Sequence, residues 1–166
     1  MFLFWKKNRS GREAQFLLET MIALGVVVVG VLSVFGFIAR GLSTNRVVAD
    51  QFTGAYLAAE GVEVVKNIID GNHRKGLPWN AGFSNGDFEV DFASVGLTPA
   101  SDRPLRMDPN TGLWNYGEGQ TSHFVRTIHV EMLDQDEMRI NSLVRWSSRG
   151  GTYDVDVEDH FYNWRF

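Results

Sequence analysis

The hydrophobic and polar positions of this 166-residue chain fall into three successive patterns. In the first, residues 20–39 carry no charged side chain, and most are Val, Leu, Ile, Phe, Ala or Gly. At a rise of about 1.5 Å per residue, a helix of this length spans roughly 30 Å, the thickness of the hydrocarbon core of a bilayer. The pattern therefore predicts a membrane-spanning helix, which we place at residues 15–43.

In the second pattern, over residues 44–70, hydrophobic residues recur every three or four positions. This spacing predicts an amphipathic helix with one apolar stripe. Joined to the first segment, it would make a continuous helix of roughly 80 Å, with Gly71 as its C-cap after Asp70. We expect the stripe to cover the chain's own sheet rather than bind a foreign partner. Its members are Val48, Phe52, Ala55, Ala59, Val62, Val65 and Ile69.

The third pattern is that of a β domain at residues 88–166, preceded by a glycine- and proline-rich loop at residues 71–87. At the first strand, Phe88, Val90 and Phe92 alternate with acids, which is typical of a half-buried strand. A polar, proline-containing stretch follows over residues 98–110. Strands are expected at residues 87–92, 112–116, 123–133, 138–147 and 152–162, with turns at 134–137 and 148–151.

Three consecutive strands with short turns favour an antiparallel meander. The predicted class is therefore α+β, with a long N-terminal helix packed on a C-terminal antiparallel β-meander.

Charge is unevenly distributed along the chain, whose formal net charge is −4. Residues 1–14 carry four basic side chains and one acid, so they hold +3 and residues 15–166 hold −7. A basic leader before an apolar helix predicts a cytoplasmic N-terminus. The acidic remainder argues against a nucleic-acid partner, which would require a basic face. The chain has no cysteine, so an extracytoplasmic domain would fold without disulfides.

A small residue, Ala14, stands before the apolar run, whereas a signal peptide has its cleavage site after a shorter run. Cutting there would remove the basic leader and leave the helix on the mature chain. The segment A14-Q15-F16-L17-L18-E19-T20-M21-I22-A23-L24 resembles the N-terminal methylation motif of type IV pilins and type II secretion pseudopilins. Residues 58–72 also resemble the second half of the helix in minor, PilV-like pilins.

The resemblance implies processing by a prepilin peptidase between Ala14 and Gln15, followed by methylation of the new amine of Gln15. Glu19 then becomes the fifth mature residue, as in the family. The family more often has Gly before the cut and Phe or Met after it. The nearest glycine, Gly11, would place Glu19 eighth instead. The implied assembly residues are Phe16, Leu17, Leu18 and Glu19.

Physical chemistry also singles out Glu19, because a carboxylate inside a bilayer helix costs roughly 2.5–3.5 kcal/mol unless it is paired or neutral. In the family its partner is the charged N-terminus of a neighbouring subunit. The other interpretation is that Glu19 lies at the cytoplasmic interface and extends its carboxylate to water.

The sequence evidence for catalysis or metal binding elsewhere in the chain is weaker. Residues 82–86 match the G-x-S-x-G pattern of a nucleophile elbow but lack the strand before and the helix after that it requires. His123 and His129 fall on one strand face about 20 Å apart, too far to share a metal. The acids Asp134, Asp136 and Glu137 are more typical of a solvated turn than of a calcium site, since no EF-hand spacing is present. Asp154, Asp156 and Glu158 are expected on the solvent side of their strand.

The C-terminal aromatic residues are expected chiefly to close the core, or otherwise to make subunit contacts. They are Phe161, Tyr162, Trp164 and Phe166.

The resemblance implies a structural subunit, most simply a minor pilin, with no enzymatic activity and no cofactor. Its implied partners are the prepilin peptidase, other pilin or pseudopilin subunits, an inner-membrane assembly platform, and membrane lipid before assembly. Its implied location is the inner membrane and then an extracytoplasmic filament. Two alternatives stay open: a pseudopilin of a secretion or DNA-uptake system, and an uncleaved single-pass protein with a β sensor domain.

Overall fold

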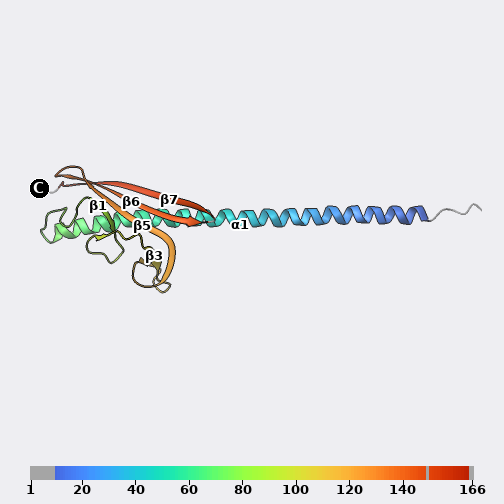
Figure 1. Ribbon diagram of the computed structural model, residues 1–166, viewed down its shortest axis with the longest axis horizontal. Helices are drawn as coiled ribbons and strands as arrows, with labels where there is room; N and C mark the ends of the chain where they lie inside the picture. Colours follow the sequence, from blue (N-terminus) through green and yellow to red (C-terminus); the bar gives the residue numbers. More distant parts are fainter. Residues whose placement is uncertain (1–9, 149, 165–166) are drawn as a thin grey trace, which may run out of the picture. The chain divides into compact units, whose positions relative to one another are not determined.

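The structure, a computed structural model, describes residues 10–148 and 150–164 and has an α+β fold. One long helix, α1 (Ser10–Arg74), precedes an antiparallel sheet that has seven strands among the described residues (Figure 1). The chain divides into two compact units, residues 1–46 and residues 47–166. The predicted fold class is thereby confirmed. Most of the predicted leader, residues 1–9, and the C-terminal Phe166 lie outside the described residues.

The helix α1 continues past its predicted end at residue 70 and stops at Arg74. Gly76 has a φ of +70°, and its amide donates to the carbonyl of His73 at 3.1 Å. The amide of Leu77 donates to the carbonyl of Asn72 at 3.0 Å. These two bonds form a Schellman motif with Gly76 at C′. The prediction of Gly71 as the cap was wrong, because Gly71 lies one turn earlier, inside the helix.

Strand β5 lies at the centre of the sheet. It pairs along one side with β6, which pairs with β7, and along the other side with β1 and β3; β2 adds to β1, and β4 adds to β3. All of these pairings are antiparallel, so the β5–β6–β7 meander is as predicted. The strands are β1 (Gly86–Glu89), β2 (Thr98–Pro99), β3 (Pro104–Met107), β4 (Trp114–Asn115), β5 (Gln120–Met132), β6 (Glu137–Ser148) and β7 (Gly151–Tyr162).

Two strand predictions need correction. The polar stretch at residues 98–110 contains β2 and β3, whose Leu105 is fully buried. The first predicted strand ends at Glu89, and its alternation is broken. Glu89 is buried while Phe92 is 49% exposed, because the Glu89 carboxylate finds partners inside the protein.

The second half of α1 covers one face of the sheet (Figure 1). Two clusters of buried residues join them, one around Val65, Ile69, Val130 and Ile140, the other around Leu57, Phe124 and Trp146. The buried positions of α1 follow a helical period, as expected. They are Gly54, Leu57, Ala58, Gly61, Val64, Val65, Ile68, Ile69 and Asn72.

The predicted apolar stripe was therefore wrong in its position on the helix. Val65 and Ile69 are buried, but Val48 is 42% exposed and Phe52 is 66% exposed. The buried face is rotated by roughly a quarter of a turn from the predicted stripe. Its centre is made by Gly54 and Gly61 rather than by large apolar residues. A Cβ on Gly54 would lie 2.6 Å from the Trp146 ring, and one on Gly61 would lie 2.4 Å from Ser142 Oγ.

The first unit presents the opposite situation. Every residue from 12 to 41 is exposed, and the helix is long and apolar enough to cross a membrane. A Cβ added to Gly25, Gly30 or Gly36 would have no atom within 4 Å, apart from the neighbouring backbone of the same helix. In the described part of this unit, no other element shields the apolar side chains from water.

Candidate functional site

The predicted processing and assembly residues lie together near the start of α1. Ala14 and Gln15 are in its second turn, and both are exposed. Phe16, Leu17 and Leu18 follow with exposures of 66%, 64% and 61%. Because residues four apart share a helix face, Gln15 and Glu19 lie on the same side, one turn apart.

The polar side chains of the apolar span differ in how they are satisfied. Thr20 Oγ1 donates to the carbonyls of Phe16 and Leu17 at 3.0 and 2.9 Å. Ser33 Oγ donates to the carbonyl of Val29 at 2.7 Å. Within the described residues, the Glu19 carboxylate takes part in no hydrogen bond or ion pair. An ionised carboxylate only accepts hydrogen bonds, so it cannot bond to the helix carbonyls as the hydroxyls do.

The Glu19 carboxylate thus has no cationic donor among the described residues. Arg12 is two turns away on the helix, and no ion pair joins the two side chains. A compact ammonium group or a proton would satisfy the carboxylate in an apolar environment. The surrounding exposed Phe16, Leu17 and Leu18 would exclude water around such a contact only when another apolar surface covers them.

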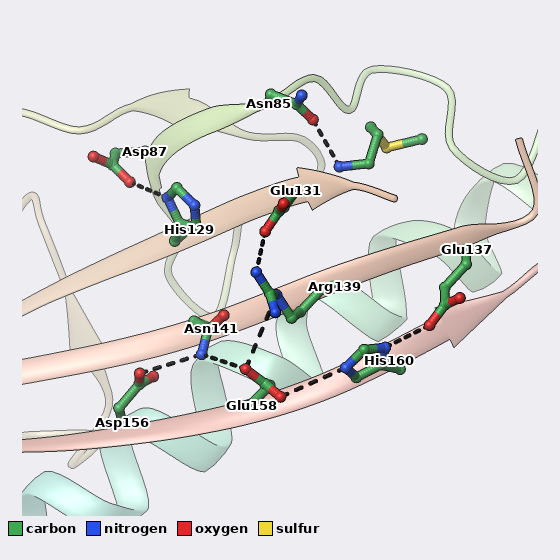
Figure 2. Close-up of polar contacts among 11 residues, drawn as sticks. Asn85, Asp87, His129, Glu131, Glu137, Arg139, Asn141, Asp156, Glu158 and His160 are labelled. Carbon is green, nitrogen blue, oxygen red and sulfur yellow. Dashed lines mark hydrogen bonds and ion pairs between the residues drawn. The ribbon is translucent and has the colours of Figure 1, made fainter. Parts of the chain in front are cut away.

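A second polar surface lies on the face of the sheet opposite α1, across β5, β6 and β7. Figure 2 shows Asp87 Oδ1 beside His129 Nδ1 at 2.7 Å and His160 Nδ1 beside Glu137 Oε1 at 2.6 Å. Between these pairs, Arg139 donates to Glu131, and Asn141 Nδ2 donates to Asp156 and Glu158 at 3.2 and 3.1 Å. Part of this surface, which includes His129, Arg139, Asn141 and Glu158, forms a shallow trough of about 530 Å³.

Two side chains of this surface have shifted pKa values. The hydrogen bond to Glu137 raises the pKa of His160 above its usual value, assisted by Glu158. The hydrogen bond from Asn141 lowers the pKa of Glu158, assisted by His160. Both shifts favour the charged forms. Glu158 therefore lies among cationic partners, Arg139 at 4.0 Å and His160 at 3.5 Å, whereas Asp156 accepts from the neutral Asn141 amide.

The predicted metal candidates are not brought together. His123 and His129 are both exposed on the same face of β5, as expected, but each pairs with a separate acid, Asp50 or Asp87. In the described part of the chain, no group of three or more His, Asp or Glu side chains is placed to hold a metal ion. In the acidic turn, Asp134 Oδ1 accepts from the amide of Asp136 at 2.7 Å, and both residues are exposed as predicted. The prediction was wrong for Glu137, which is half-buried at the start of β6 because its carboxylate bonds to His160 and Tyr162.

The remaining predicted features also have ordinary positions. The G-x-S-x-G segment at residues 82–86 forms a turn that leads directly into β1, so the helix of a nucleophile elbow does not follow it. Asp154, Asp156 and Glu158 are exposed, as expected. Among the C-terminal aromatic residues, Phe161 packs against the core, whereas Tyr162 and Trp164 are 53% and 67% exposed.

Sequence reasoning missed a buried arginine that joins α1 to the sheet. Arg126 on β5 is 1% exposed, donates to the carbonyl of Leu57 at 2.8 Å, and also bonds to the carbonyl of Val90. Glu60 lies 3.7 Å from its guanidinium. Burial raises the pKa of Glu60, although Arg126 partly opposes this. The only sequence signal was an arginine within the alternating pattern of a strand.

A second missed contact holds the loops together. Glu89 Oε2 accepts from Arg103 Nη2 at 2.6 Å and Nε at 3.0 Å, and its Oε1 accepts from the amide and hydroxyl of Ser101. Burial opposes ionisation of Glu89, but the hydrogen bonds from Arg103 and Ser101 outweigh it and lower its pKa. The regular alternation of acids at residues 87–91 concealed this inward carboxylate.

Comparisons of the chain with known protein families, with curated proteins and with solved structures find no match. The class of protein that the fold defines is an α+β chain with one N-terminal helix able to cross a membrane.

Proposed function

We propose that this chain is a structural subunit of a type IV pilus-like filament, most simply a minor pilin. The observation that carries the proposal is the exposed apolar span of α1 with one charged residue near its start. Nothing in the described first unit covers this span or pairs with Glu19. Both features are explained together if lipid covers the span before assembly and neighbouring helices cover it afterwards.

The proposed mechanism is non-covalent assembly. A prepilin peptidase cuts between Ala14 and Gln15, and the amine of Gln15 is methylated. The apolar helices then leave the bilayer through an assembly platform and pack against one another. Glu19 meets the amine of a neighbouring subunit, which selects the register because an unpaired carboxylate in an apolar environment is costly. The sheet domain supplies lateral contacts, and the chain itself performs no chemistry.

The mass of the N-terminal peptide, purified from native membrane and surface fractions, tests the processing step. We expect a chain that begins at Gln15 and carries one added methyl group. A chain that still begins at Met1 in all fractions would contradict the proposal and favour an uncleaved membrane anchor.

The assembly step is tested by Glu19→Ala, with Glu13→Ala as the matched control. Both remove one exposed acid from α1, but Glu13 lies in the leader that is removed. We expect Glu19→Ala to be cut normally and to accumulate in the membrane, while its filament fraction falls at least about tenfold, equivalent to about 1.4 kcal/mol. Glu13→Ala should assemble as wild type, and equal assembly of both variants would exclude the register role of Glu19.

A further inference from the structure

The outer edge of β7 is an open side of the sheet. Among the described residues, β7 pairs only with β6. The amide of Asn163 donates to the carbonyl of Asp136, the residue opposite it, at 2.8 Å. Because hydrogen-bonded and non-hydrogen-bonded pairs alternate along an antiparallel ladder, this bond determines which residues of β7 bond to β6. Odd-numbered residues of β7 bond to β6, and even-numbered residues direct their amide and carbonyl groups outward. An exposed row of this kind can pair with another strand.

The end of this edge after residue 158 is closed. The amide of His160 donates to the Asp159 carboxylate at 2.8 Å, and the amide of Trp164 donates to the carbonyl of Tyr162 at 3.1 Å. Asp159 also places a charge on the face of β7 that looks toward α1. Inward charges are a common protection against strand pairing.

Residues 152–158 have no such protection in the described structure. Their inward side chains are Tyr153, Val155 and Val157, which are only half-buried against the second core cluster. The backbone groups that point away from β6 are those of Thr152, Asp154, Asp156 and Glu158, and no described residue hydrogen-bonds to them.

The flank of α1 beside β7 changes from mixed to apolar along the helix. Beside the closed end of β7, Val62 and Ile69 line a groove of about 560 Å³ together with the polar side chains of Glu63, Lys66, Asp70 and His73. Gly54 meets the ring of Trp146, the cross-strand neighbour of Tyr153, so α1 and β7 run in the same direction (Figure 1). The open residues 152–158 therefore lie along the earlier turns of the same flank. By the helical period, that flank is formed by Val48, Phe52, Ala55 and Ala59, each exposed.

Charge selects the occupant of this edge. Three of its four open residues, Asp154, Asp156 and Glu158, are acids on the outer face. Glu158 is already paired with Arg139 and His160, but Asp154 and Asp156 form no ion pair with a described residue. Arg145, opposite Asp154, is engaged by Asp102 at 3.1 Å. A second copy pairing through the same edge would place acids opposite acids, which is destabilising. A basic strand would instead place cations there.

We propose that residues 152–158 of β7 and the adjacent flank of α1 bind an extended segment of another protein by strand addition. In this segment, Lys or Arg alternates with apolar residues. Its basic side chains face Asp154, Asp156 and Glu158, and its apolar side chains cover the flank of Val48, Phe52, Ala55 and Ala59. Main-chain hydrogen bonds supply affinity, and the alternating side chains supply specificity.

The test uses the full chain in detergent micelles and the peptide acetyl-Lys-Val-Lys-Val-Lys-Val-Lys-amide. We expect it to bind at least about tenfold more tightly, about 1.4 kcal/mol, than two control peptides. In the first, the lysines are replaced by glutamates; in the second, the lysine amides are N-methylated, which keeps the charge and removes the donors. On binding, amide exchange should slow at Asp154, Asp156 and Glu158, while the odd-numbered amides stay as slow as before.

The matched protein variants are Asp154→Asn/Asp156→Asn/Glu158→Gln and Glu118→Gln/Asp134→Asn/Asp136→Asn, which remove the same charge. Only the first should weaken binding of the lysine peptide, by at least about tenfold. Equal binding of the N-methylated peptide, or no new protection at the even-numbered amides, would overturn strand addition. Protection of those amides that grows with protein concentration in the absence of peptide would replace the proposed occupant by a second copy.

Discussion

Gly61 shows how a residue without a side chain determines the distance between α1 and the sheet. An added Cβ would lie 2.4 Å from Ser142 Oγ and 2.8 Å from Ile128 Cδ1. Both neighbours are fully buried and cannot move aside into solvent. The absence of a large side chain here is therefore a packing requirement, although in a helix interior glycine is otherwise unfavourable.

We expect Gly61→Ala to lower the free energy of unfolding by about 1–3 kcal/mol, the usual cost of overpacking. Gly71→Ala is the control, because Gly71 is on the same helix with no atom within 4 Å of an added Cβ; it should stabilise by up to about 1 kcal/mol. Denaturation followed by tryptophan fluorescence measures both. In the Gly61→Ala background, Ser142→Ala removes the Oγ atom and should restore part of the lost free energy of unfolding. If the effects of the two substitutions were simply additive, the close contact between Gly61 and Ser142 would be contradicted.

The ion pair of Glu89 and Arg103 gives a second prediction at this scale. Arg103→Met would leave a buried carboxylate with only the bonds from Ser101, at an expected cost of about 1–3 kcal/mol at pH 7. The pKa of Glu89 is lowered in the folded protein. Its stabilising contribution is thus present above the usual value of 4.5 and is lost as the pH falls through the folded pKa.

The difference between wild type and Arg103→Met should accordingly shrink as the pH falls below about 4.5. Arg106→Met is the matched control, since Arg106 on β3 forms no ion pair within the described structure. Urea denaturation at several pH values measures the difference. A constant difference across the pH range would show that Arg103 stabilises through packing alone, for example on the Tyr116 ring.

At the scale of elements, the end of the β6–β7 pair is held by His160. Its imidazole lies between Glu137 and Glu158, and the hydrogen bond to Glu137 raises its pKa. Because this pKa is raised in the folded protein, the stabilisation that protonated His160 gives to the folded state is complete below the usual value of 6.5. It is lost as the pH rises through the folded pKa.

We expect amide exchange near residues 158–162 to quicken, beyond its intrinsic rise with pH, as the pH rises above 6.5 in wild type. His160→Gln should remove this additional dependence, because glutamine keeps a hydrogen-bond donor but does not titrate. His123→Gln, which alters a histidine on β5, should retain it. An additional dependence that persists in His160→Gln would assign the effect to another group.

The elements differ in how well the sequence predicted them. The strands β5, β6 and β7 were found because long alternating runs leave little ambiguity. The strand β3 was missed because Leu105 is its only fully buried residue, amid prolines and charges. The helix stripe was placed on the wrong face because hydrophobic periodicity counts large side chains, while the closest approach of α1 to the sheet is made by Gly54 and Gly61.

The buried polar contacts could not be predicted either, because each joins residues far apart in the sequence. Arg126 and Glu89 bond to groups that are distant in the sequence, Leu57 and Arg103, and only the fold brings these together. The processing and assembly roles of residues 14–19 rest on local sequence features, namely a basic leader, a small residue and one acid before an apolar run, and they stay predictions.

At the scale of the whole molecule, stability and the proposed anchoring belong to different parts of the chain. Among the residues that the structure describes, every buried hydrophobic residue falls between Leu57 and Trp146, whereas residues 20–39 of the apolar span are all exposed. We therefore expect residues 47–166 to fold without the span. A chain that begins at Val47 should be soluble without detergent and should unfold within about 4 °C of the full chain in micelles, a difference of less than about 1 kcal/mol.

A chain that begins at Val62 is the control for this prediction. It lacks Leu57 and Ala58, which form the helix side of the second core cluster, and loss of one buried leucine side chain alone costs about 2–5 kcal/mol. It also loses the carbonyl of Leu57 that accepts from buried Arg126. We expect this shorter chain to be largely unfolded at 25 °C. If the chain from Val47 were equally unfolded, residues before 47 would have to contribute to the stability of the sheet domain, and the separation of stability from anchoring would be wrong.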